Sequence, residues 1–201
     1  MTVGMATQRV TWRRMDELAT DEHATLTIRD TGLALIGTII GAERGVPLRV
    51  EYRVMTDGAG LTTGAHVRQL RGFEQRTLTI DRSAKGSWSV NGVAASALRG
   101  CTDIDLELSP STNTLPIRRL RLGIGATQTV KAAWVRFPDL VVERSDQTYT
   151  RLDEFTYRYE SGGFSAELVA DDAGLVASYA VWERTGVATG PDSTEPLDAV
   201  R

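Results

Sequence analysis

The chain has 201 residues, 41% of them hydrophobic, which is enough to bury the core of one domain or of a long all-β domain with a tail. A formal net charge of −3 argues against a nucleic-acid-binding protein and against a polybasic membrane-surface protein. The single cysteine, Cys101, excludes an intramolecular disulfide framework and a Cys-rich zinc site, and with only two histidines we predict no metal site and no cofactor.

The first eighteen residues, MTVGMATQRVTWRRMDEL, contain no long apolar segment before their charges, which argues against a secretory signal. The longest apolar run, GLALIGTIIG at residues 32–41, is too short to span a bilayer as a helix. We therefore expect a soluble, cytoplasmic protein with no integral membrane segment.

Alternation of apolar and polar residues is the dominant pattern along the chain, and it is typical of half-buried antiparallel strands. The apolar members are Ala24, Leu26 and Ile28; Leu48, Val50, Tyr52 and Val54; Leu78 and Ile80; Phe155, Tyr157 and Tyr159; and Phe164, Ala166, Leu168 and Ala170. Turn signals separate these runs, and the sharpest of them, Asn91-Gly92, predicts a hairpin. The pattern predicts a mainly β protein with one large antiparallel sheet curled into a roll or partial barrel.

The segment from residue 101 to residue 125 interrupts this regularity. Residues 101–108 alternate as one more strand, with Asp103 and Asp105 on the face opposite Ile104. A Ser/Thr/Asn cluster at residues 111–113 can cap a helix, and Pro116 is compatible with its first turn. We predict one helix at about residues 112–122, which fills the concave face of the sheet.

The last stretch, residues 185–201, is small, polar and contains Pro and Gly. We expect it to be a flexible tail that follows a single domain over residues 1–184.

Two clusters of charge near the helix admit more than one interpretation. Asp103 and Asp105, about 7 Å apart on a strand, either form the acid/base pair of a hydrolase or anchor a neighbouring arginine or turn. Arg118, Arg119 and Arg121 either bind a phosphate or sugar-phosphate head group or make internal salt bridges to the nearby carboxylates.

Other polar and aromatic residues are also open to two interpretations. Asn113 either holds the strand-to-helix turn through local backbone bonds or contacts a ligand. Trp134 and Tyr149, like the other aromatic residues, either line a cavity or belong to the core. Cys101 is better interpreted as a core residue than as a nucleophile, because no motif links it to a histidine.

The run GCTDIDLELSPSTNTLPIRRL, beginning at Gly100, resembles the signature of the putative glycolipid-binding family. That signature is a Cys-x-Asp-x-Asp-Leu stretch followed by Thr-Asn-Thr-Leu-Pro-Ile-Arg-Arg-Leu. Further matches, such as PLRVEYRV, AAWVRFPDL and GLVASYAVWER, extend the resemblance over residues 12–184. Where relatives often have an aromatic residue after the proline, this chain has Ser111.

The resemblance implies a spiral β-roll, in which a many-stranded antiparallel sheet wraps round one helix, and it suggests a homodimer. It also implies a shape similar to that of the periplasmic carriers that move lipoproteins to the outer membrane. The resemblance implies no catalytic residue.

The function that we favour from the sequence is non-enzymatic binding of a glycolipid or another lipid-like, amphipathic small molecule, with no nucleic-acid partner. The candidate ligand-binding residues are Asp103, Asp105, Asn113, Arg118, Arg119, Trp134 and Tyr149. The alternatives are a hydrolase that uses Asp103 and Asp105, and a dimeric protein-interaction module.

Overall fold

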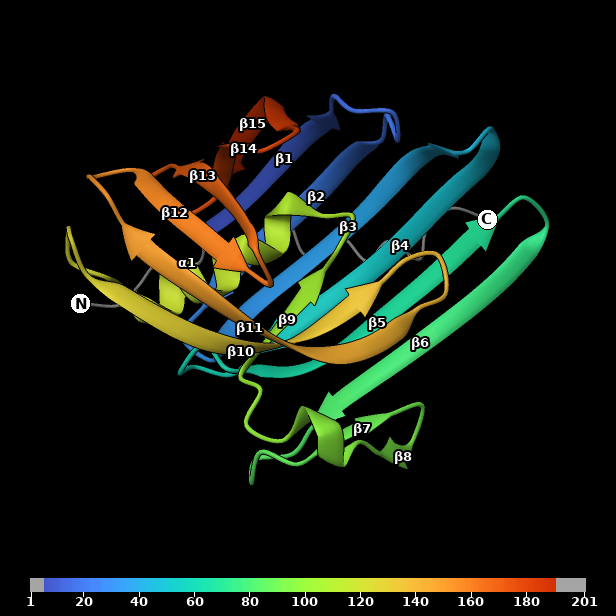
Figure 1. Ribbon diagram of the computed structural model, residues 1–201, viewed down its shortest axis with the longest axis horizontal. Coiled ribbons are helices and arrows are strands. Elements are labelled where there is room, and N and C mark those ends of the chain that lie inside the picture. Colours follow the sequence, from blue (N-terminus) through green and yellow to red (C-terminus); the bar gives the residue numbers. More distant parts are fainter. Residues whose placement is uncertain (1–5, 191–201) are drawn as a thin grey trace.

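The computed structural model describes residues 6–190 and shows a β-rich fold wrapped around one helix (Figure 1). The strands are β1 Ala6–Arg14, β2 Asp21–Arg29, β3 Gly32–Glu43, β4 Val46–Thr56, β5 Thr62–Arg71, β6 Glu74–Arg82, β7 Trp88–Val90, β8 Val93–Ala94, β9 Asp103–Leu106, β10 Thr127–Arg136, β11 Val141–Arg151, β12 Thr156–Ser161, β13 Phe164–Ala170, β14 Val176–Tyr179 and β15 Trp182–Gly190. The helical segments are a 3₁₀ turn η1 Ser96–Leu98, a second 3₁₀ turn η2 Pro110–Asn113, and the helix α1 Thr114–Leu120.

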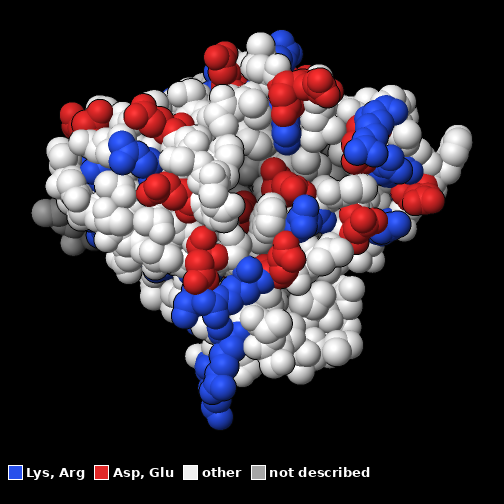
Figure 2. All heavy atoms as spheres, in the orientation of Figure 1, with Lys and Arg blue, Asp and Glu red and all other residues white. Residues whose placement is uncertain are grey.

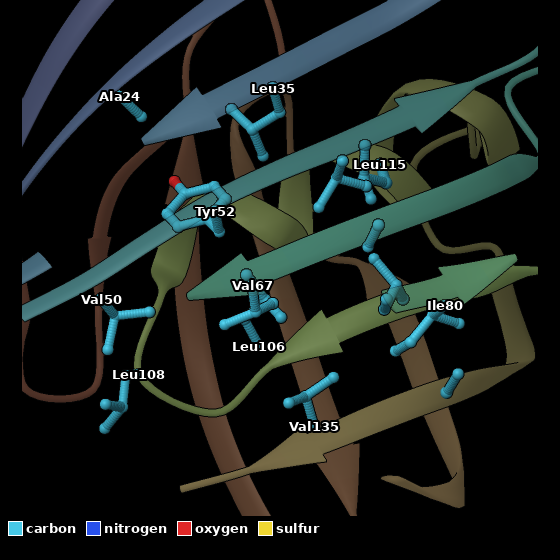
Figure 3. Close-up of a cluster of buried hydrophobic side chains, with 14 of the residues drawn as sticks. Ala24, Leu35, Val50, Tyr52, Val67, Ile80, Leu106, Leu108, Leu115 and Val135 are labelled. Atoms are coloured by element: carbon cyan, nitrogen blue, oxygen red, sulfur yellow. The ribbon is translucent and has the colours of Figure 1, made fainter. Parts of the chain in front are cut away.

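All fifteen strands belong to one sheet, in the order β8-β7-β6-β5-β4-β3-β2-β1-β15-β14-β13-β12-β11-β10-β9. The sheet is not closed, but its β9 end curls back over β5, where the backbone N–H of Thr62 donates to the carbonyl of Thr102 at 3.0 Å. Figure 3 shows Leu106 of β9 between Val67 of β5 and Val135 of β10. The predicted curled β-roll around a helix is confirmed.

One strand departs from the predicted antiparallel arrangement, since β9 pairs with β10 in the parallel sense. The strand β9 also lacks the predicted division into one buried apolar face and one exposed polar face. Cys101, Asp103, Ile104 and Leu106 are all at most 1% exposed. The reason is that β9 lies inside the curl of the sheet, so both of its faces meet protein.

The alternation of β4 has the predicted effect, because Leu48, Val50, Tyr52 and Val54 are buried while Arg49 and Arg53 on the opposite face are exposed. Asn91 and Gly92 have φ angles of 49° and 77° and connect β7 to β8, so the predicted hairpin is confirmed.

The helix is shorter than predicted. It covers Thr114–Leu120, with Pro116 in its first turn, and Arg121 ends it in the left-handed conformation before Gly123 is reached. Asn113 occupies the N-cap position of α1, within the predicted residues 111–113, but its side chain makes no capping bond. The capping bond lies one element earlier, where the Ser109 hydroxyl accepts a bond from the Ser111 N–H at the start of η2. The extra 3₁₀ turn therefore uses the polar residues that we had assigned to the helix.

The helix α1 lies between the β1–β5 wall and the β10–β13 wall of the roll (Figure 1). Leu115 belongs to a core cluster formed mainly by β1–β7, β9 and β10. Ile117 belongs to a second cluster that contains Tyr149, Tyr157 and Tyr159. Side chains of the helix and of both walls thus fill the interior of the roll.

The first residues of the expected flexible tail belong to the sheet instead. Residues 185–190 belong to β15, which pairs with β1 along the sheet. They carry the small and polar side chains typical of a tail, but pairing with β1 satisfies their backbone groups. Residues 191–201, the rest of the predicted tail, lie outside the described part of the chain.

Tyr52 lies across Gly37 of the neighbouring strand, its direct partner in the ladder. A methyl group at Gly37 would overlap the Tyr52 ring. The position therefore requires the absence of a side chain, a common reason for glycine within a strand.

We predict that Gly37→Ala lowers the free energy of unfolding by about 1–3 kcal/mol, because the buried ring has no space into which to move. Gly123→Ala is the control, since nothing lies within 4 Å of the added methyl group there. Urea unfolding measures both variants, and equal stabilities of the two would contradict the predicted overlap.

Candidate functional site

The strand β9 and the helix α1 are joined by a buried ion pair. The Asp103 side chain, 2% exposed, accepts bonds from two nitrogens of the Arg119 guanidinium and from the Thr102 hydroxyl at 2.7 Å. The bond from Arg119 Nε to Asp103 Oδ1 is 3.2 Å long. A buried carboxylate needs such donors, so this pair fixes the position of the helix against the strand.

Asp105, the second carboxylate of β9, has no arginine partner among the residues that the structure describes. Its two oxygens accept bonds from the Thr112 hydroxyl at 3.2 Å and from Gln147 Nε2 at 2.6 Å. Burial raises the pKa of Asp105 to about 6, against the lowering effect of these two bonds. Both aspartates are thus held by neighbouring side chains inside the roll.

Asn113 connects the end of η2 to the second wall of the roll. Its amide nitrogen donates to the carbonyl of Pro110 at 3.2 Å, and its oxygen accepts a bond from the Tyr149 hydroxyl at 2.7 Å. Tyr149 is 1% exposed and packs edge-to-face on Tyr159. Both residues of this pair are therefore occupied by contacts within the protein.

Trp134 is half-buried on β10, with the Arg136 guanidinium carbon 4.9 Å from its ring centroid. Cys101 is buried, and burial raises the pKa of its thiol to about 11, so that it remains protonated at neutral pH. Within residues 6–190, no group of three or more His, Cys, Asp and Glu side chains is arranged to hold a metal ion. The helical segments of that range include none with the length and apolar character needed to cross a bilayer.

Two open clefts lie on either side of the C-terminal end of α1. The first, of about 390 Å³, has apolar side chains from Ile117, Phe155 and Tyr157 in its lining. The second, of about 420 Å³, lies against β2 and β3 and includes Ile28 and Leu33. We call these the first cleft and the second cleft.

The two clefts have Arg118 and Arg121 in common. Arg151 completes the arginines of the first cleft, and Arg119 also borders the second cleft. Of the seven residues predicted to bind a ligand, only Arg118 and Arg119 line either cleft.

Two turns of the same design form the outer walls of these clefts. The turn at residues 57–61 reads Asp-Gly-Ala-Gly-Leu, and that at residues 171–175 reads Asp-Asp-Ala-Gly-Leu. In each turn the Asp side chain accepts bonds of 2.9–3.0 Å from the backbone N–H groups two and four residues later. The shared Asp-x-Ala-Gly-Leu pattern is the signal in the sequence that these two turns form a pair.

Each of these turns places a glycine against one arginine of the helix. Gly60 and Gly174 have φ angles of 79° and 77°. A methyl group on Gly60 would lie 3.2 Å from Arg119 Cβ, and one on Gly174 would lie 2.9 Å from Arg118 Cγ. The two walls of the roll therefore hold the end of α1 from two sides.

A buried polar cluster at the other end of the helical segment was not predicted. Glu22 of β2 is 3% exposed, and its Oε1 accepts bonds from the Tyr52 hydroxyl and from the Ser109 hydroxyl at 2.7 Å. Ser111 lies 2.8 Å from the Tyr52 hydroxyl and 2.5 Å from that of Ser109. Within the described residues Glu22 Oε2 is buried with no hydrogen-bond partner. The available signal was that Glu22 shares the strand face of Ala24 and Leu26.

Burial raises the pKa of Glu22 to about 7, while the bonds from Tyr52, Ser109 and Ser111 act in the opposite direction. The folded protein therefore binds a proton more tightly than the unfolded chain, in which the pKa is near 4.5. As a result, stability is expected to fall as the pH rises from about 4.5 to about 7.

We predict that Glu22→Gln removes on the order of 3 kcal/mol of this pH dependence. Asp105 contributes a decrease of the same sign, but between its unfolded pKa of 3.8 and about 6. Between pH 6 and 7 most of the remaining decrease comes from Glu22, so urea unfolding in this interval tests Glu22→Gln, with Asp105→Asn as the control. Equal slopes for Glu22→Gln and the unmodified protein in that interval would contradict the assignment.

The arginines of the helix are expected to differ in their effect on stability. Arg119→Met leaves the buried Asp103 carboxylate without its cation and is predicted to cost about 3–5 kcal/mol. Arg121→Met, at an exposed position of the same segment, is predicted to change stability by less than about 0.5 kcal/mol. Chemical denaturation at pH 7 compares the two, and a similar cost for both would show that the ion pair does not hold the helix.

Comparisons with known proteins agree with this fold. The chain is similar to the crystal structure of a DUF1089 family protein from Pseudomonas aeruginosa, with a TM-score of 0.73 and 31% sequence identity over 81% of this chain and 91% of the other. No curated protein matches the chain. The family model described as putative glycolipid-binding matches residues 9–184. The resemblance noted at residues 100–120 is thereby confirmed, and the chain belongs to the putative glycolipid-binding family.

Proposed function

We propose that the protein binds an amphipathic small molecule, such as a glycolipid or another lipid-like compound, in the clefts beside α1. The observation that supports this is the mixed lining of the clefts. In the first cleft Phe155 and Tyr157 lie in the same lining as Arg118 and Arg151. Apolar side chains offer a surface for the body of such a ligand, and the arginines offer donors for its polar part.

The packing of the core supports a binding site at one end of the roll rather than at its centre. The centre of the roll is filled by Leu115, Ile117 and the walls that they contact. We therefore place the ligand at the end of the roll, where the C-terminal end of α1 leaves two open clefts. Arg118 remains a proposed ligand-binding residue, and Arg121 and Arg151 join it.

The hydrolase alternative receives less support from the geometry. A pair of carboxylates that acts on a substrate must be reached by that substrate. Asp103 is bound by Arg119, and Asp105 by Gln147 and Thr112. Neither aspartate lines the first or the second cleft.

The homodimer suggested by the resemblance is supported by one observation, which also applies to a protein-interaction module. On the outer face of β3, Ile36 is 37% exposed and Ile40 is 53% exposed. Exposed aliphatic side chains on a flat sheet favour contact with a second protein surface. We propose a dimer that acts in the cytoplasm, and light scattering at several concentrations measures its mass.

We predict that Phe155→Ser weakens binding of a fluorescent long-chain amphiphile about tenfold, since it removes aromatic surface from the first cleft. Phe73→Ser, at a fully exposed aromatic residue outside both clefts, is the matched control. Fluorescence titration measures both variants.

The companion experiment is mass spectrometry of lipids extracted from protein that was purified gently from its own cell. A bound amphiphile is the expected result. The proposal fails if the native protein carries none and the fluorescent probe binds no better than it does to an unrelated protein.

A further inference from the structure

We propose that the point where the two clefts meet is an oxyanion site, in which Arg118 and Arg121 bind one phosphate-like group. The inference rests on the proposed function, because it identifies the chemical group that forms the polar part of the proposed ligand. It goes beyond that function by naming the charge and chemical class of this part, and the residues that recognise it.

The position of the two arginines is the first argument. They are the residues that the linings of both clefts share, so a group bound between them is reachable from either side of α1. Arg118 is half-buried, and one of its terminal nitrogens donates to the carbonyl of Ala173, which leaves its other donors available. Arg121 follows at the end of the helix with φ of 46°, in an exposed position.

The second argument is the state of their charges. Among the described residues, neither Arg118 nor Arg121 makes an ion pair with a carboxylate, whereas Arg119 between them is neutralised by Asp103. Burial, followed by the nearby charge of Arg121, lowers the pKa of Arg118, while the carboxylate of Asp171 acts in the opposite direction. An anion placed between these two cations offsets both the repulsion and the loss of solvation.

Arg151 adds a third guanidinium to the first cleft. Its nitrogens donate to the backbone carbonyls of Leu122 at 2.8 Å, Asp153 at 3.0 Å and Glu154 at 2.6 Å. These carbonyls orient the side chain without cancelling its charge. Arg151 therefore increases the positive potential of the first cleft while remaining fixed in place.

The carboxylates of the clefts limit the size of the anion. Asp171 is bound by Arg184 and by its own turn, and Asp57 accepts two backbone bonds within its turn. Asp30, Glu154 and Asp172 also line the clefts. Figure 2 shows acidic and basic side chains interspersed over much of the visible face. Such a surface repels an extended polyanion and suits a single phosphate-sized group, to which guanidinium donors match in geometry.

Isothermal titration calorimetry on the full chain tests the proposal with three probes: dodecyl phosphate, dodecyl glucoside and inorganic phosphate, with both detergents below their micelle concentrations. We expect dodecyl phosphate to bind at least about tenfold more tightly than dodecyl glucoside. Of these two detergents, added salt is expected to weaken the binding of dodecyl phosphate alone. Arg118→Met and Arg121→Met are expected to remove this preference, because each variant lowers the affinity for dodecyl phosphate much more than the affinity for the glucoside.

Arg158→Met, which removes an exposed charge from β12 outside both clefts, is the matched control and is expected to retain the preference. If Arg118→Met fails to fold, the exposed Arg121 still tests the site by itself.

The three probes separate the two proposals. If both detergents bind equally well, and Arg121→Met does not change their binding, the oxyanion site is overturned and the amphiphile function is retained. If inorganic phosphate binds as tightly as dodecyl phosphate, and its binding depends on Arg121, the oxyanion site is supported as a site for a free anion. The same result overturns the amphiphile function. Absence of binding by all three probes overturns both.

Discussion

The ion pair between Asp103 and Arg119 is the interaction on which the rest of the arrangement depends. A carboxylate that is 2% exposed needs strong donors, and for Asp103 they come from the Arg119 guanidinium of α1. This match fixes the helix α1 against β9 inside the curled sheet. In that position Leu115 enters one core cluster and Ile117 the other, so the helix links the two walls of the roll.

The same constraint separates the roles of neighbouring arginines. Arg119 holds the helix through its ion pair with Asp103, whereas Arg118 and Arg121 take no part in that pair and line the open clefts. The two Asp-x-Ala-Gly-Leu turns reinforce this separation, since each closes on the helix with a glycine that tolerates a positive φ. The site proposed for the ligand is therefore a consequence of how the roll is closed.

The polar residues inside the roll serve its structure. Half-buried Asp105 accepts bonds from Thr112 and Gln147, and buried Asn113 is bonded to Pro110 and to buried Tyr149. Glu22 differs, because one of its oxygens lacks a partner among the described residues. Ser111 contacts this cluster, and its hydroxyl contributes to a bond network that an apolar side chain cannot reproduce.

Local patterns in the sequence determined the strands, the hairpin and the presence of the helix. The alternation from Leu48 to Val54, the pair Asn91-Gly92 and the proline at position 116 act over a few residues, so their effects can be predicted without knowledge of the fold. Only the tertiary structure decided that Asp103 pairs with Arg119, and that Glu22 meets Tyr52. Those contacts join residues 16 and 30 positions apart. The first depends on how far the sheet curls before its β9 end returns to β5, and the second on the alignment of β2, β3 and β4, in which Gly37 leaves room for the Tyr52 ring.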